Sequence, residues 1–258
     1  MCTIAILVDV LVDAPVAIAA NRDEFHARPA RAPVALAPGV VGGKDELLGG
    51  SWLAFSSDGR FAAVTNQREP HAPRATRSRG AWVTGLLAAG DRAAMAAFVD
   101  ALDPRAYASG NLVYGDASGV EVAYLRRDGS RARHALPPGI TVLANDRVDA
   151  PGQPKQPRLR ALLATARDRA SFAAIAPAAL ADHAVPAELP PLAPGLPVPP
   201  EAWGPLQAVC VHAGPYGTRS ATVAALVPGG IAALAWADGP PCTTAFTDAR
   251  PHFDTVGR

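Results

Sequence analysis

Apolar residues gather in short runs with β-strand character near both ends and in the middle of the chain. Two pairs of runs predict hairpins: Ile4 to Val12 with Val16 to Ala20, and Ser51 to Phe55 with Phe61 to Asn66. Asp13-Ala14-Pro15 supplies the first turn and Asp58-Gly59 the second. Further strands are predicted at Asn111 to Tyr114, Val120 to Leu125, Ile140 to Ala144, Leu206 to Val211, Thr218 to Leu226 and Ile231 to Trp236.

Between residues 80 and 102 the apolar spacing is helical, and Gly90-Asp91 divides it into two helices, with Asp91 as the N-cap of the second. Arg158 to Ala170 predicts another helix. Pro186 to Pro200 is too rich in proline for a helix or a central strand and predicts a surface loop. The intervals Ala30 to Gly50 and Arg68 to Arg79 also predict irregular loops.

This order of elements predicts an α+β fold, in which two packed antiparallel sheets are flanked by helices. No internal repeat and no convincing linker interrupts the sequence. We therefore expect one domain over residues 1–258.

Composition narrows the classes of function. Hydrophobic residues make up 49% and charged residues 18% of the 258 residues, which excludes a largely disordered chain. No unbroken apolar stretch reaches the ~18 residues typical of a membrane span. With 24 basic and 23 acidic residues, the chain has a net charge of only +1 and lacks the excess of positive charge that binds nucleic acids or anionic lipids. Small neutral or amphiphilic ligands remain possible partners, and the oligomeric state is left open.

The three cysteines, Cys2, Cys210 and Cys242, are odd in number and show no short C-x-x-C spacing. This pattern fits neither a disulfide framework nor a zinc site, and it favours a reducing compartment. His212 follows Cys210 by two residues, which is not a recognised closed metal site, so we expect the six histidines to be structural or exposed. No metal and no cofactor are expected. The first residues lack the positive region of a secretory signal, so a cytoplasmic protein is expected.

Cys2 is the most informative single residue. If Met1 is removed, Cys2 carries a thiol with a reference pKa of ~8.5 beside an α-amine with a pKa of ~7.7–8.0. The amine could then act as the base that deprotonates the thiol. Most free cysteines are instead small buried hydrophobic residues, and on Cys2 alone that interpretation is the stronger one.

Polar side chains follow several predicted strands. Asn21-Arg22-Asp23-Glu24 comes directly after Val16 to Ala20, where the first hairpin has returned to the level of Cys2. Asn66 and Asn145 each end an apolar strand, and asparagine amides can donate to an oxyanion. Arg219 stands at the start of a strand, where its guanidinium can stabilise a thiolate or bind a carboxylate. For any one of residues 21–24 alone, a solvated transition from strand to loop is a stronger interpretation than catalysis. The two asparagines can also be ordinary turn residues, and Arg219 can be a surface arginine at a strand edge.

Several motifs occur together: Met1-Cys2-Thr3, Ala20 to Phe25 with Arg28-Pro29, Gly49 to Leu53, Val64-Thr65-Asn66 and Tyr216-Gly217-Thr218-Arg219. As an ordered set, spread from residue 2 to about 226, they resemble the NRDE family, also called the transport and Golgi organisation protein 2 family. That family is similar to the N-terminal nucleophile hydrolases, which implies a four-layer αββα sandwich. The enzymes of known chemistry that it resembles, penicillin V acylases and bile salt hydrolases, hydrolyse linear amides.

The resemblance implies roles for individual residues. Cys2 would be the nucleophile, Asp23 would orient its amine, Asn66 and Asn145 would contact the oxyanion or the substrate carbonyl, and Arg219 would lie beside the thiolate. Asn21, Arg22, Trp52 and Tyr216 would bind substrate. One departure concerns Arg22, which follows Asn21 here, whereas the acylases carry an arginine before an asparagine.

Two hypotheses of different classes follow. The first is a cysteine amidohydrolase that cleaves a non-peptide linear amide of a small, partly apolar substrate. The second is a non-catalytic carrier that binds or traffics haem or an acyl lipid in the same cleft. A third possibility is a degenerate member of the family retained for partner binding. The hypotheses differ on Cys2, because only the enzyme needs its thiolate.

Overall fold

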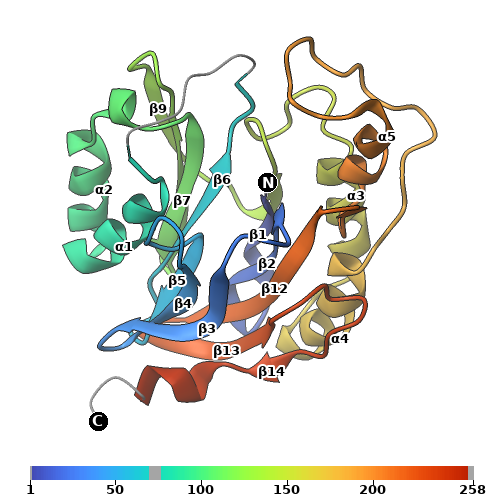
Figure 1. Ribbon diagram of the computed structural model, residues 1–258. Coiled ribbons are helices and arrows are strands. Elements are labelled where there is room, and N and C mark those ends of the chain that lie inside the picture. The colour runs from blue at the N-terminus through green and yellow to red at the C-terminus, as the bar shows by residue number, and fades with distance from the viewer. Residues whose placement is uncertain (1, 70–76, 255–258) are drawn as a thin grey trace.

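The structure is a computed structural model that describes residues 2–69 and 77–254. Two antiparallel sheets pack face to face at its centre (Figure 1). The first contains, in spatial order, β10 (Gly139–Leu143), β1 (Cys2–Leu11), β2 (Ala14–Phe25), β12 (Tyr216–Val227), β13 (Gly230–Ala237) and β14 (Thr247–Asp248), with β11 (His212–Ala213) paired to β12. The second contains β3 (Ala30–Ala37), β4 (Val40–Asp45), β5 (Leu53–Ser56), β6 (Phe61–Asn66), β7 (Gly110–Asp116), β8 (Gly119–Leu125) and β9 (Arg131–Ala135).

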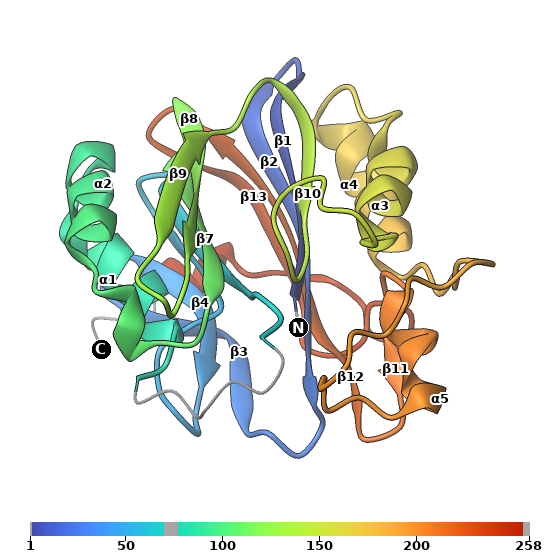
Figure 2. The same cartoon turned by 90° about the horizontal axis from the view of Figure 1, so that it is seen from above.

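Helices cover the outer face of each sheet. The helices α1 (Gly80–Ala89) and α2 (Arg92–Ala101) pack on the second sheet, and α3 (Lys155–Leu163) and α4 (Arg169–Leu180) pack on the first. The short helices are α5 (Pro200–Trp203), η1 (Pro104–Ala106), η2 (Pro205–Gln207) and η3 (Arg250–Asp254). Figure 2 shows the resulting four layers in the order helix, sheet, sheet, helix. The predicted α+β fold with an αββα sandwich is therefore confirmed.

Membrane crossing by a helix is not indicated. Within residues 2–69 and 77–254, every helix is too short or too polar to traverse a bilayer.

Strand β1 has two buried faces, which explains its unbroken apolar sequence. Ile4, Ile6 and Val8 enter the core between the sheets, whereas Ala5 and Leu7 enter the core beneath α3 and α4. Successive side chains of a strand point to opposite faces, so an inner strand of a sandwich covered by helices needs apolar residues at every position. By the same alternation, the side chain of Cys2 lies on the face between the sheets.

The first predicted hairpin is present, but its second strand is longer than expected. Strand β2 begins at Ala14, so Pro15 lies in the strand, and it continues to Phe25 instead of ending at Ala20. The polar run after Ala20 is therefore not a solvated transition to a loop. Asn21, Arg22 and Asp23 are buried, because β2 is an inner strand paired with β1 and β12.

The interval Ala30 to Gly50 was predicted as an irregular loop, and this prediction is wrong. It contains the paired strands β3 and β4, joined by a turn in which Gly39 has a φ of 66°. Strand β3, which contains one arginine and one proline, lies at the edge of its sheet, where only one side needs backbone pairing. Arg31 and Pro33 therefore interrupt the continuous apolar run that marks an inner strand of this fold. The other predicted loop, Arg68 to Arg79, lies largely outside the described residues.

Two further predictions need correction. The predicted helix Arg158 to Ala170 is divided between α3 and α4, because Asp168 caps a new helix through the backbone N–H of Ser171 at 2.8 Å. The predicted strand Leu206 to Val211 is absent. Leu206 and Gln207 lie in η2, the backbone N–H of Cys210 donates to the carbonyl of Asp182, and that of Val211 donates to the side-chain hydroxyl of Thr218. The predicted N-cap at Asp91 is confirmed by its bond to the N–H of Ala94 at 2.9 Å.

Candidate active site

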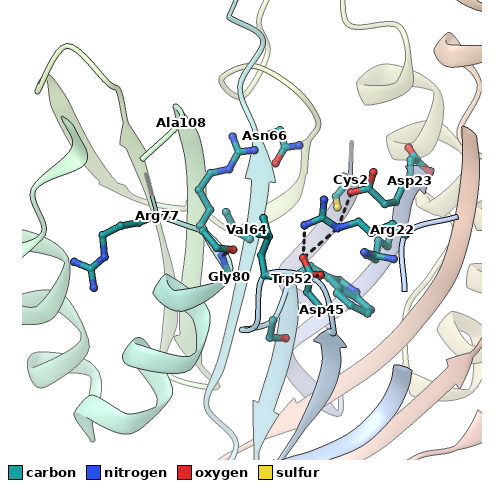
Figure 3. Close-up of a pocket in the computed structure, with 16 residues that line it drawn as sticks. Cys2, Arg22, Asp23, Asp45, Trp52, Val64, Asn66, Arg77, Gly80 and Ala108 are labelled. Carbon is teal, nitrogen blue, oxygen red and sulfur yellow. Dashed lines mark hydrogen bonds and ion pairs between the residues drawn. The ribbon is translucent and has the colours of Figure 1, made fainter. Parts of the chain in front are cut away.

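A cavity of about 500 Å³ opens between the two sheets, at the end of β1 where the described chain begins. This volume lies within the range of ordinary small-molecule sites. Its walls come from β1, β2, β4, β6, the segment that joins β4 to β5, and the beginning of α1 (Figure 3). Cys2, Arg22, Asp23, Trp52 and Asn66 of the predicted site line it.

Cys2 stands directly opposite Arg22 in the antiparallel register of β1 and β2. Both side chains therefore point from the first sheet into the space between the sheets. The thiol of Cys2 is partly covered, and burial raises its pKa, whereas the positive charge of Arg22 acts to lower it. The thiol is consequently neutral near pH 7 and needs a base before it can act as a nucleophile.

Arg22 is a buried cation at the cavity wall. Its guanidinium carbon lies 4.0 Å from the ring centroid of Trp52, and the residue is 5% exposed. The guanidinium makes no hydrogen bond or ion pair to residues 2–69 or 77–254, and burial lowers its pKa. A guanidinium has five donors, so an unpaired one at a cavity is suited to an anion or an oxyanion.

Trp52 supplies an aromatic wall and supports Arg22 by a cation–π contact. Its indole also packs edge-on against Trp236, with 6.4 Å between ring centroids. Gly43 of β4 lies directly beneath the Trp52 ring, where a Cβ atom would overlap ring carbons. The position of Trp52 therefore depends on a glycine at 43.

Asp23 forms a buried polar centre beside Cys2 (Figure 3). Its carboxylate accepts from Nζ of Lys155 at 3.2 Å and from the hydroxyl of Thr218 at 2.7 Å. Its backbone carbonyl accepts from the hydroxyl of Tyr216 at 2.8 Å. Burial raises the pKa of Tyr216, so this hydroxyl keeps its proton. Asp23 is thus held in a fixed position by donors from β12 and α3.

Lys155 was missed by sequence reasoning. It is 3% exposed and comes from the first turn of α3, far from Asp23 in sequence. The available signal was composition, because Lys155 is one of only two lysines in a chain whose other basic residues are arginines.

The two asparagines have different positions. Asn66 ends β6 and lines the cavity. Asn145 is buried outside the cavity lining, and its amide Nδ2 donates to the backbone carbonyl of Asn66 at 3.2 Å. The structure therefore brings Asn66 to Cys2, while Asn145 supports the backbone of Asn66.

Three other predicted residues do not line the cavity. The guanidinium of Arg219 donates to the backbone carbonyls of Phe25 and His26. The amide of Asn21 faces the helices and donates to the carbonyls of Leu180 and Val209 at 2.8 and 3.0 Å. The hydroxyl of Tyr216 donates to the backbone carbonyl of Asp23 instead of pointing into the cavity lining. Arg22, rather than Arg219, is the cation beside Cys2.

Charged residues that sequence reasoning did not assign complete the cavity rim. Arg28 donates to Asp45, at 3.2 Å from Nε, and lies 3.7 Å from Glu24. Arg79 also lines the cavity, and burial lowers its pKa. The rim is therefore polar and carries both positive and negative side chains, while Trp52, Leu48 and Val64 add apolar surface.

Comparison with known proteins adds family information. The family model for Transport and Golgi organisation 2 matches residues 1–230. The Transport and Golgi organization protein 2 homolog of Bos taurus is 34% identical over 148 residues, which is 52% of this chain and 51% of that protein. The Homo sapiens homolog is 31% identical over 147 residues, with the same coverage of 52% and 51%. The matched region thus spans about half the length of these curated relatives.

Comparison of folds agrees with the four-layer architecture. The C2A mutant of conjugated bile acid hydrolase from Clostridium perfringens superposes with a TM-score of 0.56, over 97% of this chain and 93% of that one. The sequence identity is 10%, so this likeness concerns the fold alone. The match of the family model over most of the sequence identifies the chain as a member of the Transport and Golgi organisation 2 family.

Proposed function

We propose that this protein is a cysteine amidohydrolase of the N-terminal nucleophile type, which cleaves a non-peptide linear amide of a small, partly apolar substrate. The observation that carries the proposal is the pairing of Cys2 with Arg22 at the cavity, because it places a thiol beside an unpaired buried cation. Asp23 lies at the same place and supplies a fixed negative charge.

Activation of the thiol requires removal of Met1 in this proposal. The freed α-amine of Cys2 takes the thiol proton, and Asp23 holds the resulting ammonium group. Arg22 stabilises the thiolate, which burial otherwise disfavours. The buried partners Lys155 and Thr218 keep the carboxylate of Asp23 in one orientation.

The reaction then follows ordinary acyl transfer. The sulfur of Cys2 forms a bond to the amide carbon, and the carbonyl oxygen becomes an oxyanion that accepts from the side-chain amide of Asn66. The C–N bond breaks as the ammonium returns its proton to the leaving amine. Water, deprotonated by the same α-amine, hydrolyses the thioester and releases the acid and the free thiol.

The cavity walls support a substrate of mixed character. Trp52 and Val64 offer apolar surface, and the unpaired guanidinium of Arg22 offers donors. A short acyl group against the indole, with a polar group near Arg22, satisfies both.

The alternative is a carrier of haem or an acyl lipid, and the raised pKa of the Cys2 thiol is the observation that favours it. A carrier needs no thiolate and leaves Cys2 as a neutral wall of the cavity. It would bind its ligand equally well after Cys2→Ala.

A panel of acyl amides and lactams, with haem binding measured in parallel, tests the proposal. Hydrolysis should disappear in Cys2→Ala, which should still fold and bind substrate. Ser57→Ala, at an exposed turn between β5 and β6, serves as the control and should retain full turnover. Ligand binding without hydrolysis in every variant would favour the carrier.

A further inference from the structure

Four side chains that bind transition metals come together outside the cavity: His183, Cys210, His212 and Cys242. One potential ligand atom from each lies within 4.8 Å of the others. Within residues 2–69 and 77–254, this is the one group of three or more such residues close enough to share an ion. It was not apparent from the sequence, because its members come from three separated segments.

The distances fit a tetrahedral zinc ion. Sγ of Cys210 lies 3.9 Å from Sγ of Cys242 and 3.8 Å from Nε2 of His212, and that nitrogen lies 3.3 Å from Sγ of Cys242. With Zn–S bonds of ~2.3 Å and Zn–N bonds of ~2.0–2.1 Å, the edges of a tetrahedron measure about 3.8 Å between sulfurs and about 3.6 Å between sulfur and nitrogen. The three observed distances are close to these edges.

Other contacts hold the ligands in place without an ion. The backbone N–H of Cys210 donates to the carbonyl of Asp182 at 2.8 Å, which brings the end of α4 and His183 beside it. The amide of Asn21 binds carbonyls just before both segments, at Leu180 and Val209. The segments that carry His183, Cys210 and His212 are thus anchored to Asn21 of strand β2.

His183 has the environment of a metal-binding histidine. Its Nδ1 lies 3.3 Å from the backbone carbonyl of Cys210. A carbonyl can only accept, so the proton of a neutral His183 belongs on Nδ1 and the lone pair is on Nε2. Metal-bound histidines commonly donate their second N–H to such an acceptor. The ring of His183 also lies 4.9 Å from that of His212, between centroids.

We infer that His183, Cys210, His212 and Cys242 bind one Zn²⁺ ion as a Cys₂His₂ site. The two thiols release their protons to solvent as the metal–sulfur bonds form. Four protein ligands leave no open position for substrate, so the ion has a structural role. It connects the end of α4, strand β11 and the turn after β13.

The zinc site also lies next to Thr218, one of the side chains that donate to the carboxylate of Asp23. Val211, between two of the ligands, donates its N–H to the hydroxyl of Thr218 at 2.9 Å, and that hydroxyl donates to Asp23 at 2.7 Å. An ion that orders residues 210–212 therefore fixes one of the donors to Asp23.

Titration of the reduced, metal-free full chain tests the inference. Zn²⁺ should bind at one ion per chain and raise the Tm. Co²⁺ should bind at the same stoichiometry and give the absorbance of thiolate-ligated tetrahedral cobalt. His212→Gln and Cys242→Ser change exposed residues, so they should fold normally and weaken Zn²⁺ binding at least about tenfold. His134→Gln and Cys2→Ser are matched controls outside the group and should bind Zn²⁺ as the wild type does.

Three results would overturn the inference. One is the absence of stoichiometric Zn²⁺ binding by the reduced chain. Another is unchanged affinity in both His212→Gln and Cys242→Ser. The third is a Cys210–Cys242 disulfide that forms in preference to the metal site and persists in the purified protein with Zn²⁺ present, which peptide mapping without reductant detects.

Discussion

Lys155 and Asp23 form an ion pair, with 3.2 Å between Nζ and Oδ2, and their side chains are 3% and 0% exposed. Asp23 directly follows the residue that pairs with Cys2, so this ion pair fixes helix α3 to the candidate active site. Removal of one member of a buried pair leaves the other as an uncompensated charge, which is far more costly than the loss of a surface pair.

Lys155→Met should lower the free energy of unfolding by about 3–5 kcal/mol. Urea denaturation measures the change, and Lys44→Met, which removes the other, exposed lysine, is the matched control. Addition of Asp23→Asn should destabilise Lys155→Met less than it destabilises the wild type, because the ion pair with Lys155 is already absent. Equal stability of Lys155→Met and Lys44→Met would contradict the ion pair.

Alkylation of Cys2 should report the effect of Arg22 on its thiol. Because burial raises the pKa of Cys2, the reactive thiolate is scarce at neutral pH, and the rate with iodoacetamide should still be increasing above pH 9.0. Arg22→Gln removes a charge that lowers this pKa, so the rate at pH 8 should fall at least about threefold.

Peptide mapping follows Cys2 separately from the other cysteines, and Arg31→Gln, which removes an exposed arginine paired with Glu46, is the control. A rate in Arg22→Gln equal to that of Arg31→Gln would show that Arg22 does not stabilise the thiolate.

Gly43→Ala should displace Trp52, because the added methyl group overlaps its ring. We expect a loss of about 1–3 kcal/mol in stability and a changed near-UV circular dichroism spectrum. Gly204→Ala is the control, since the nearest atoms to an added Cβ lie at 3.7 Å, an ordinary contact. An unchanged spectrum in Gly43→Ala would show that Trp52 does not rest on this glycine.

Asn66→Ala should lower kcat about 10²–10³-fold with little change in KM, because the lost amide serves the oxyanion. Arg219→Ala should leave kcat nearly unchanged, since its guanidinium binds carbonyls at the end of β2 instead of lining the cavity. The steady-state kinetics of a substrate found in the amide screen decide between these roles. A larger kcat loss in Arg219→Ala than in Asn66→Ala would reverse the assignment.

Sequence reasoning succeeded where local chemistry decides the structure. Asp58-Gly59 forms the predicted turn, and Asp91 caps α2 as expected, because both effects involve only neighbouring residues. The apolar run of β1 was recognisable because both of its faces are buried. The predicted hairpin also placed Cys2 beside the polar end of β2, where the structure pairs it with Arg22.

The failures occurred where distant residues decide. The polar end of β2 remains a strand because β1 and β12 pair with it on both sides. Lys155 reaches Asp23 across a separation of 132 residues, which no local pattern reveals. Strand β9 has five exposed residues and no apolar alternation, so its place at the edge of a sheet leaves little signal.

The central claim is that the sulfur of Cys2, at a free amino terminus, attacks an amide carbonyl. The most direct test mixes the protein rapidly with an intact acyl amide that it can hydrolyse, quenches the reaction with acid and measures the mass of the intact protein. The account predicts that the purified wild-type chain lacks Met1 and gains one acyl group on Cys2, and that Cys2→Ala gains none. An active protein that retains Met1, or turnover in Cys2→Ala at the wild-type rate, would contradict it.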